Sequence, residues 1–177
     1  LVVAFLCAMS LAVLADNLGI LWVALEATTI TTAFLVGHYR ARTSLEAAWK
    51  YVVLGSVGVA IALLGIVLLY AATVEAGQPT LSWTVLAHDG LTLDPGLVKI
   101  AAGLTLLGFA TKAGLAPMHS WLPDAHSQAP AAVSGLMSGV LLSVAFYGIL
   151  RIQAITDAVI GPELMRGLLI AGGLLSI

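Results

Sequence analysis

The chain has 177 residues, of which 60 % are hydrophobic and 9 % are charged, and its formal net charge is −2. Because a soluble domain carries charge on about a quarter of its residues, this composition excludes an ordinary soluble protein and indicates an integral membrane protein. The slight acidic excess gives no indication of a nucleic-acid partner, and the single cysteine, Cys7, cannot form an internal disulfide.

Six apolar stretches predict an all-α, polytopic bundle of transmembrane helices, because about 20 apolar residues in a helix cross a bilayer. The predicted spans are 1–15, 18–37, 51–74, 97–121, 130–150 and 163–177. The first and last stretches are short for a span. We therefore expect the chain to be a fragment of a longer polytopic protein.

Two polar connectors indicate the orientation in the membrane. The connector 38–50 is mostly basic, whereas the connector 75–96 contains acidic residues and neither lysine nor arginine. The charged residues are Arg40, Arg42, Glu46 and Lys50 in the first connector and Glu75, Asp89 and Asp94 in the second. Because basic connectors stay in the cytoplasm, we expect 38–50 on the cytoplasmic side and 75–96 outside.

Glu26 lies inside the second predicted span, where a charged group costs a few kcal/mol and persists mainly beside a cavity or a partner. Four threonines follow Glu26 within the next six residues, and Thr29 shares a helical face with Glu26. This pattern favours a wet interior site with a functional carboxylate. The alternative is a structural glutamate that pairs with a lysine and fixes the register of the helices.

Lys112 lies inside the fourth predicted span, and Pro117 follows it. Proline removes a backbone donor and clashes with the carbonyl four residues earlier, so we expect the helix to loosen just after Lys112. Irregular backbone at membrane depth is tolerated beside a cavity, which favours an ion path. The alternative is a lysine that extends to the cytoplasmic interface.

A lysine and a carboxylate that can approach and separate would form a proton relay, because each changes the proton affinity of the other. His119 would share a face with Lys112 in an unbroken helix and could pass protons at neutral pH; it could equally be a hydrogen-bonded interfacial histidine. Lys50 could mark the mouth of a proton entry path, or simply pair with Glu46 one turn earlier.

Asp124 and His126 lie in a turn between two prolines, where we expect them to shape and cap the turn. Their spacing with His119 indicates no specific metal site. The sequence contains no phosphate-binding loop, no nucleophile–base signature, no cysteine cluster and no convincing pair of haem ligands. We therefore expect no metal, cofactor or redox centre in this chain.

Three stretches carry a family resemblance: LWVALEATTITTAFLVGHYR, SLEAAWKYVVLGSVG and LLGFATKAGLAPMHSWLPDAHSQAPAAVSG. They resemble the antiporter-like, proton-translocating membrane subunits of respiratory complex I, membrane-bound hydrogenases and multi-subunit cation/proton antiporters. The amino-acid sequences of these stretches are most similar to the F-type subunit of hydrogenase-4. The resemblance implies the first half of an inverted-repeat antiporter-like fold, with a discontinuous helix near Lys112 and Pro117.

The resemblance also implies roles for single residues. Glu26 matches the glutamate and Lys112 the lysine of the family's proton path, and Lys50 falls where some members have an ionisable residue. One departure concerns the following helix, where many members carry a lysine or histidine. Here that helix offers only hydroxyl groups, among them Ser138 and Ser143.

These features predict a proton-translocating, multi-pass subunit in the inner (plasma) membrane, where it would contact lipid and other membrane subunits. The complex would be an oxidoreductase of the NADH:quinone or hydrogenase type, with electron transfer in the partner subunits. Two alternatives remain. One is a Na⁺(K⁺)/proton antiporter subunit without a redox partner, and the other is a scaffold subunit that transports no ion.

Overall fold

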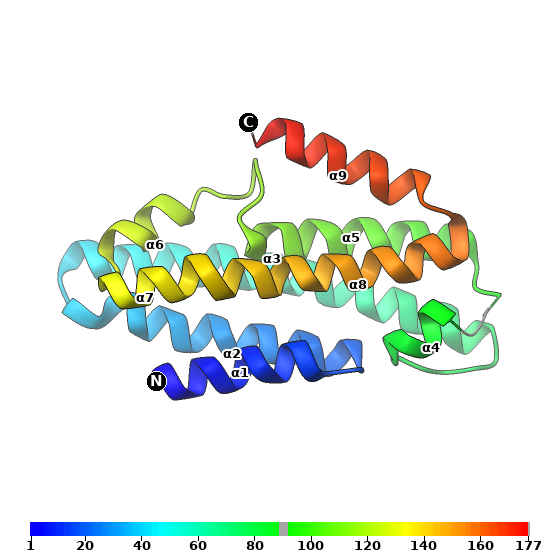
Figure 1. Ribbon diagram of the computed structural model, residues 1–177, viewed down its shortest axis with the longest axis horizontal. Helices are drawn as coiled ribbons and strands as arrows, with labels where there is room; N and C mark the ends of the chain where they lie inside the picture. Colours follow the sequence, from blue (N-terminus) through cyan, green and yellow to red (C-terminus); the bar gives the residue numbers. More distant parts are fainter. Residues whose placement is uncertain (89–91, 177) are drawn as a thin grey trace.

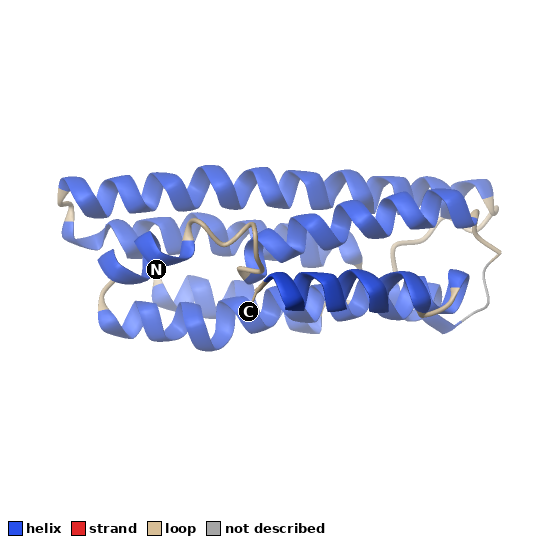
Figure 2. Ribbon diagram, turned by 90° about the horizontal axis from the view of Figure 1, so that it is seen from above, coloured by secondary structure: helices blue, strands red, loops and turns tan. Residues whose placement is uncertain are grey.

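The computed structural model describes residues 1–88 and 92–176, and these residues fold into helices that run mostly along one long axis (Figure 1). Figure 2 shows the same arrangement from above, with loops at both ends and one further loop near the middle of the long axis. The helices are α1 (Val2–Leu14), α2 (Leu18–Val36), η1 (Gly37–Tyr39), α3 (Arg42–Glu75), α4 (Trp83–His88), α5 (Pro95–Ala113), α6 (Leu122–Gln128), α7 (Ala131–Leu136), η2 (Met137–Leu141), α8 (Leu142–Ile160) and α9 (Glu163–Leu175).

Within the described residues, four helical segments are long and apolar enough to cross a membrane: Leu18–Tyr39, Arg42–Glu75, Pro95–Ala113 and Ala131–Ile160. The last of these joins α7, η2 and α8 into one rod, in which η2 is a π-helical segment. The all-helical, multi-span architecture predicted from the apolar stretches is therefore confirmed. The flanking α1 and α9 have 13 residues each.

Three boundaries differ from the sequence-based expectations. The connector 38–50 is not a separate loop, because α3 begins at Arg42 and continues for 34 residues. The helix expected over 97–121 ends at Ala113. In the connector 75–96, residues 83–88 form the short helix α4, while Asp89 lies outside the described residues.

Capping residues explain where two of the long helices begin. The Asn17 side chain accepts hydrogen bonds from the backbone N–H groups of Gly19 and Ile20, and the Asp94 side chain accepts one from Leu97. Pro95 then occupies the first turn of α5, where the missing N–H removes no helical hydrogen bond. These caps fix the starts of α2 and α5, which carry Glu26 and Lys112.

Small residues bring α3 and α5 close together at the centre of the bundle. A methyl group built on Gly65 would lie 2.6 Å from Thr105 Cγ2 and 2.7 Å from the carbonyl oxygen of Ala101. One on Gly108 would lie 2.6 Å from the Cβ of Ala62. Larger side chains would push the two helices apart. This close packing sets which turn of α3 faces Lys112.

The turn between α1 and α2 is fastened to the segment that leads into α4. The Asp16 carboxylate accepts hydrogen bonds from Ser82 Oγ at 2.5 Å and from Thr84 Oγ1 at 2.8 Å. These hydrogen bonds, with that of Ser82 the strongest, hold the pKa of Asp16 below its usual value. On α8, the Arg151 guanidinium lies 3.3 Å from the centre of the Trp83 ring, which ties α4 to α8.

The two ends of the bundle thus differ. Figure 1 places η1, the start of α3 and α6 at one end, and α4 at the other. The first end carries the basic residues of the connector 38–50, and the second carries the anchored Asp16. The candidate site described next lies between α2, α3 and α5, closer to the end that carries α6.

Candidate functional site

The helix that carries Lys112 ends one residue later, at Ala113. Gly114 takes a left-handed conformation with φ of 72°, which glycine adopts without steric cost. The backbone N–H of Leu115 then donates to the carbonyl oxygen of Ala110 at 2.9 Å, as in a common helix-ending motif. The loosening expected after Lys112 is present, but Gly114 ends the helix, and Pro117 lies farther on in the irregular segment 114–121.

Lys112 is completely buried, with 0 % of its surface exposed. Its Nζ donates hydrogen bonds to Tyr51 Oη at 2.6 Å and to Thr29 Oγ1 at 2.8 Å. The Tyr51 side chain is also fully buried, and its ring centre lies 4.6 Å from the Nζ atom. The lysine therefore does not extend to the interface, and its proton-bearing end faces α2 and α3.

Glu26 is partly buried on α2 and lies on the other side of Thr29. Thr29 Oγ1 can donate to Glu26 Oε2 at 3.2 Å, and also to the carbonyl oxygen of Leu25 at 3.3 Å. Ser56 Oγ on α3 donates to Glu26 Oε1 at 3.0 Å. Within the described residues Lys112 and Glu26 form no direct ion pair; one threonine hydroxyl separates them.

We define Glu26, Thr29, Tyr51, Ser56 and Lys112 as the buried network. It joins three helices through side-chain hydrogen bonds and contains one acid, one base and three hydroxyl groups. Hydroxyl groups both donate and accept, so a chain of them can pass a proton between a carboxylate and an amine. This is the chemistry that the arrangement can perform.

Tyr51 and Ser56 were missing from the residues expected from sequence. Both lie in a span without any charge, and nothing in their spacing separates them from ordinary interfacial or packing residues. The one available signal is that Tyr51 directly follows Lys50 at the start of an apolar run. Their role depends on the register between α3 and α5, which the close packing at Gly65 and Gly108 determines.

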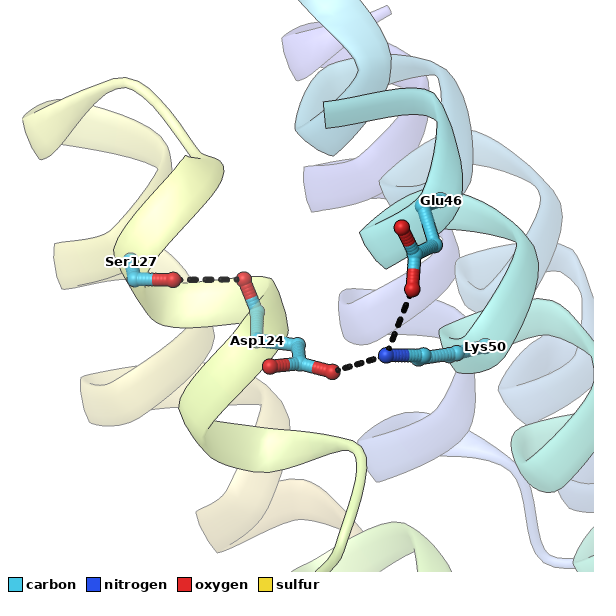
Figure 3. Close-up of polar contacts among 4 residues, drawn as sticks. All are labelled: Glu46, Lys50, Asp124 and Ser127. Atoms are coloured by element: carbon cyan, nitrogen blue, oxygen red, sulfur yellow. Dashed lines mark hydrogen bonds and ion pairs between the residues drawn. The ribbon is translucent and has the colours of Figure 1, made fainter. Parts of the chain in front are cut away.

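Lys50 lies at the surface, outside the buried network. Its Nζ is 2.9 Å from Glu46 Oε1 on the same helix and 2.9 Å from Asp124 Oδ2 on α6. Figure 3 shows the lysine between these two carboxylates, with Ser127 Oγ donating to the backbone carbonyl of Asp124. Asp124 therefore does more than shape its own turn, because it joins α6 to α3.

The two histidines have separate surroundings. His119 is exposed in the segment 114–121, and within the described residues it makes no side-chain hydrogen bond. The face shared with Lys112 does not form, because the helix ends before it. His126 is partly buried on α6, and its Nδ1 lies 2.8 Å from Ser134 Oγ. Partial burial lowers the pKa of His126.

Ser138 and Ser143 lie on the outer surface of the rod formed by α7, η2 and α8. Ser143 Oγ donates to the carbonyl oxygen of Gly139 at 3.1 Å within the same rod. The structure does not bring either serine to the buried network. Within the described residues, 1–88 and 92–176, no group of three or more His, Cys, Asp or Glu residues is placed to hold a metal ion.

The site can be compared with known proteins. Residues 15–177 match the family described as NADH:quinone oxidoreductase/Mrp antiporter, TM. The chain is 43 % identical to the hydrogenase-4 component F homolog of Methylacidiphilum infernorum (isolate V4) over 98 % of its own length. It spans 37 % of that relative.

Two solved structures contain chains with a similar fold. One is the membrane-bound sulfane sulfur reductase, an archaeal respiratory membrane complex, with a TM-score of 0.86 and 28 % identity over 97 % of this chain and 34 % of that chain. The other is respiratory complex I from Thermus thermophilus, with a TM-score of 0.69 and 27 % identity over 88 % of this chain and 42 % of that chain.

Proposed function

Because the chain belongs to the NADH:quinone oxidoreductase/Mrp antiporter transmembrane family, we propose that it translocates protons as part of a membrane subunit of a complex-I-like or hydrogenase-linked oxidoreductase. It is a multi-pass membrane protein, as the sequence predicted, and the family occurs in the cytoplasmic membrane of prokaryotes. The observation that carries the proposal is the buried network, in which a lysine and a glutamate are joined by the Thr29 hydroxyl.

In the proposed mechanism Lys112 holds a proton and passes it through Thr29 toward Glu26. The direction of the hydrogen bonds supports this order, because Lys112 donates to Thr29 and Thr29 donates to Glu26. Each transfer would reverse the hydroxyl, which a threonine side chain can do by rotation. Any conformational change that alters the distance between lysine and carboxylate changes the proton affinity of both groups.

Protons would enter from the end that carries α6. We assign this end to the cytoplasm, since its surface carries Arg40, Arg42 and Lys50. Lys50 and the exposed His119 would collect protons there, while Pro117 and Asp124 shape the irregular segment and α6. His126 with Ser134 would offer a further proton-carrying contact at the start of the following rod, whereas Ser138 and Ser143, on its outer surface, would lie outside this path.

The partners would be the other membrane subunits of the complex, and electron transfer would take place in them. The hydrogenase-4 component F homolog shares the largest identity among the relatives named above, which favours a hydrogenase-linked complex. The family description also includes Mrp antiporters, so a Na⁺(K⁺)/proton antiporter subunit is the second candidate.

Ion flux in vesicles tests the proposed function. The full-length protein would be reconstituted with its complex, and internal pH and internal Na⁺ would be followed by fluorescent indicators after the electron donor is added. We expect proton movement that depends on electron transfer and does not require Na⁺ or K⁺. Proton movement driven by a cation gradient alone would instead show an antiporter, and the absence of any ion movement would show a scaffold.

The two adjacent buried threonines provide a matched pair of variants. Thr29→Val removes the hydroxyl between Lys112 and Glu26, and losing one hydrogen bond from the transfer path is expected to slow proton flux about tenfold. Thr28→Val makes the same chemical change at a residue whose hydroxyl bonds only to the carbonyl oxygen of Leu25 among the described residues, at 2.6 Å, and should keep most of the flux. Equal rates in the two variants would contradict the assigned path.

A further inference from the structure

The buried network is closed on the side of α6. Lys112 and Tyr51 have no exposed surface, so in this conformation water cannot deliver a proton to either of them. A proton-translocating site must exchange with water at some stage of its cycle. Direct exchange between Lys112 and water requires a neighbouring element to move, and the contacts around Tyr51 indicate which one.

Trp121 covers the network from the start of α6. Its side chain is fully buried, and its ring contacts the Tyr51 ring edge to face, with 5.0 Å between ring centres. Its Nε1 donates to the backbone carbonyl oxygen of Thr111 at 2.8 Å, next to Lys112. The indole thus contacts both the tyrosine that binds Lys112 and the end of the helix that carries it.

An exposed ion pair lies beside this aromatic contact and joins the same two elements. Lys50 directly precedes Tyr51 on α3, and Asp124 follows Trp121 by three residues on α6. The Lys50 and Asp124 side chains are 49 % and 45 % exposed, and their charged atoms lie 2.9 Å apart. Figure 3 shows this bridge from α6 to α3.

The third member of the ion cluster makes the bridge reversible. Lys50 also lies 2.9 Å from Glu46 on its own helix, so it keeps a partner when α6 moves away. Exposed ion pairs contribute little stability in water. Breaking the Lys50–Asp124 ion pair therefore leaves no buried charge unpaired. It requires only a small change in the surroundings of α6.

The flanks of α6 also permit movement. The helix has seven residues and follows the irregular segment 114–121, which begins with the left-handed Gly114. Within α6, Ala125 is the buried residue. Apart from Trp121 and Ala125, the segment 117–128 presents half-buried or exposed side chains, so its apolar contacts with the core are concentrated at Trp121, Leu122 and Ala125.

We propose that α6 is a lid over the proton site, with the Trp121 indole as its cover and the Lys50–Asp124 ion pair as its latch. Opening the latch moves Trp121 away from Tyr51 and gives water access to Lys112. Glu46 competes with Asp124 for Lys50 and so favours the open lid. The inference rests on the proposed function for its purpose, but the movement itself can be measured without proton transport.

Thiol labelling of Ala125→Cys measures lid opening. Ala125 lies on the buried face of α6 with 0 % exposed surface, and cysteine is a small, readily buried replacement. Cys7 is first changed to serine, because it is exposed. The rate of reaction with a water-soluble methanethiosulfonate reagent is then followed in membrane vesicles that contain the full-length protein in its complex, without electron donor.

The two carboxylates around Lys50 give opposite expectations. Asp124→Asn removes the latch and is expected to speed labelling up to about fivefold, since the contribution of an exposed ion pair corresponds to at most about a fivefold change in an equilibrium. Glu46→Gln removes the competitor and should slow labelling or leave it unchanged. Ala72→Cys, a buried position near the far end of α3, should react at the same slow rate in both backgrounds.

Three results would overturn the proposal. If Asp124→Asn does not change the labelling rate of Ala125→Cys, the ion pair does not hold the lid closed. Faster labelling in both carboxylate variants would show a general charge effect. Faster labelling of Ala72→Cys alongside Ala125→Cys would show general loosening of the fold. Because no proton flux is measured, these results differ from a failure of the proposed function.

Discussion

Replacing Lys112 with alanine is expected to lower proton translocation by about 100-fold, the lower end of what a positioned acid–base group contributes. The side chain is the fully buried base of the network, and it donates to the hydroxyl groups of Thr29 and Tyr51, of which Thr29 leads on to Glu26. Lys112→Arg is the sharper variant, because arginine keeps the positive charge but does not release its proton. We expect Lys112→Arg to lose as much proton translocation as Lys112→Ala.

The measurement is the rate of pH change inside vesicles that contain the full-length protein in its complex. Assembly is checked by purification of the intact complex, and Lys99→Arg is the matched control, since Lys99 is exposed on the same helix. Normal proton flux in Lys112→Ala would exclude this lysine from the path. Normal flux in Lys112→Arg would show that only its charge is needed.

Glu26→Gln is expected to have the second-largest effect, also a loss of about 100-fold in proton flux. Glutamine keeps the size of the side chain and can still accept a hydrogen bond from Ser56, so the packing of α2 against α3 should survive. It cannot take up a proton in this range of pH. The path would therefore end at Thr29 while the structure stays intact.

Glu75→Gln serves as the control for this prediction. Glu75 is an exposed carboxylate at the end of α3, away from the buried network and from Lys50. Its replacement should leave the maximal proton flux within about twofold, as expected for a surface substitution far from the acid–base groups. Equal losses in Glu26→Gln and Glu75→Gln would indicate a general effect of negative charge and would contradict the role assigned to Glu26.

The sequence predicted the architecture well where the physical signal is local. Long apolar stretches identified the regions of the four helical segments that are long enough to cross a membrane, because membrane insertion depends on the length and hydropathy of each stretch. The position predicted for the end of α5 was less accurate. Pro117 suggested a break, but the break is the left-handed Gly114, whose neighbour Leu115 closes the last turn by a hydrogen bond to Ala110. The order Lys-Ala-Gly-Leu is itself a helix-ending signal.

The candidate site was predictable only in part. Glu26 and Lys112 are conspicuous because a charge inside an apolar span has a high energetic cost. Tyr51 and Ser56 are neutral residues in another helix, and their contacts depend on the register between helices, which no local pattern encodes. His119 would share a face with Lys112 only in an unbroken helix, and the helix end at Ala113 leaves it exposed at the surface.

The central claim is that a proton passes through Glu26, and infrared difference spectroscopy during turnover tests it most directly. A carboxylic acid has a C=O stretch that a carboxylate lacks, and this band shifts when the exchangeable proton is replaced by deuterium. The account predicts a band that appears and decays during turnover, shifts in D₂O, and is missing in Glu26→Gln but present in Glu75→Gln. A turnover spectrum without such a band, or with the same band in Glu26→Gln, would contradict the account.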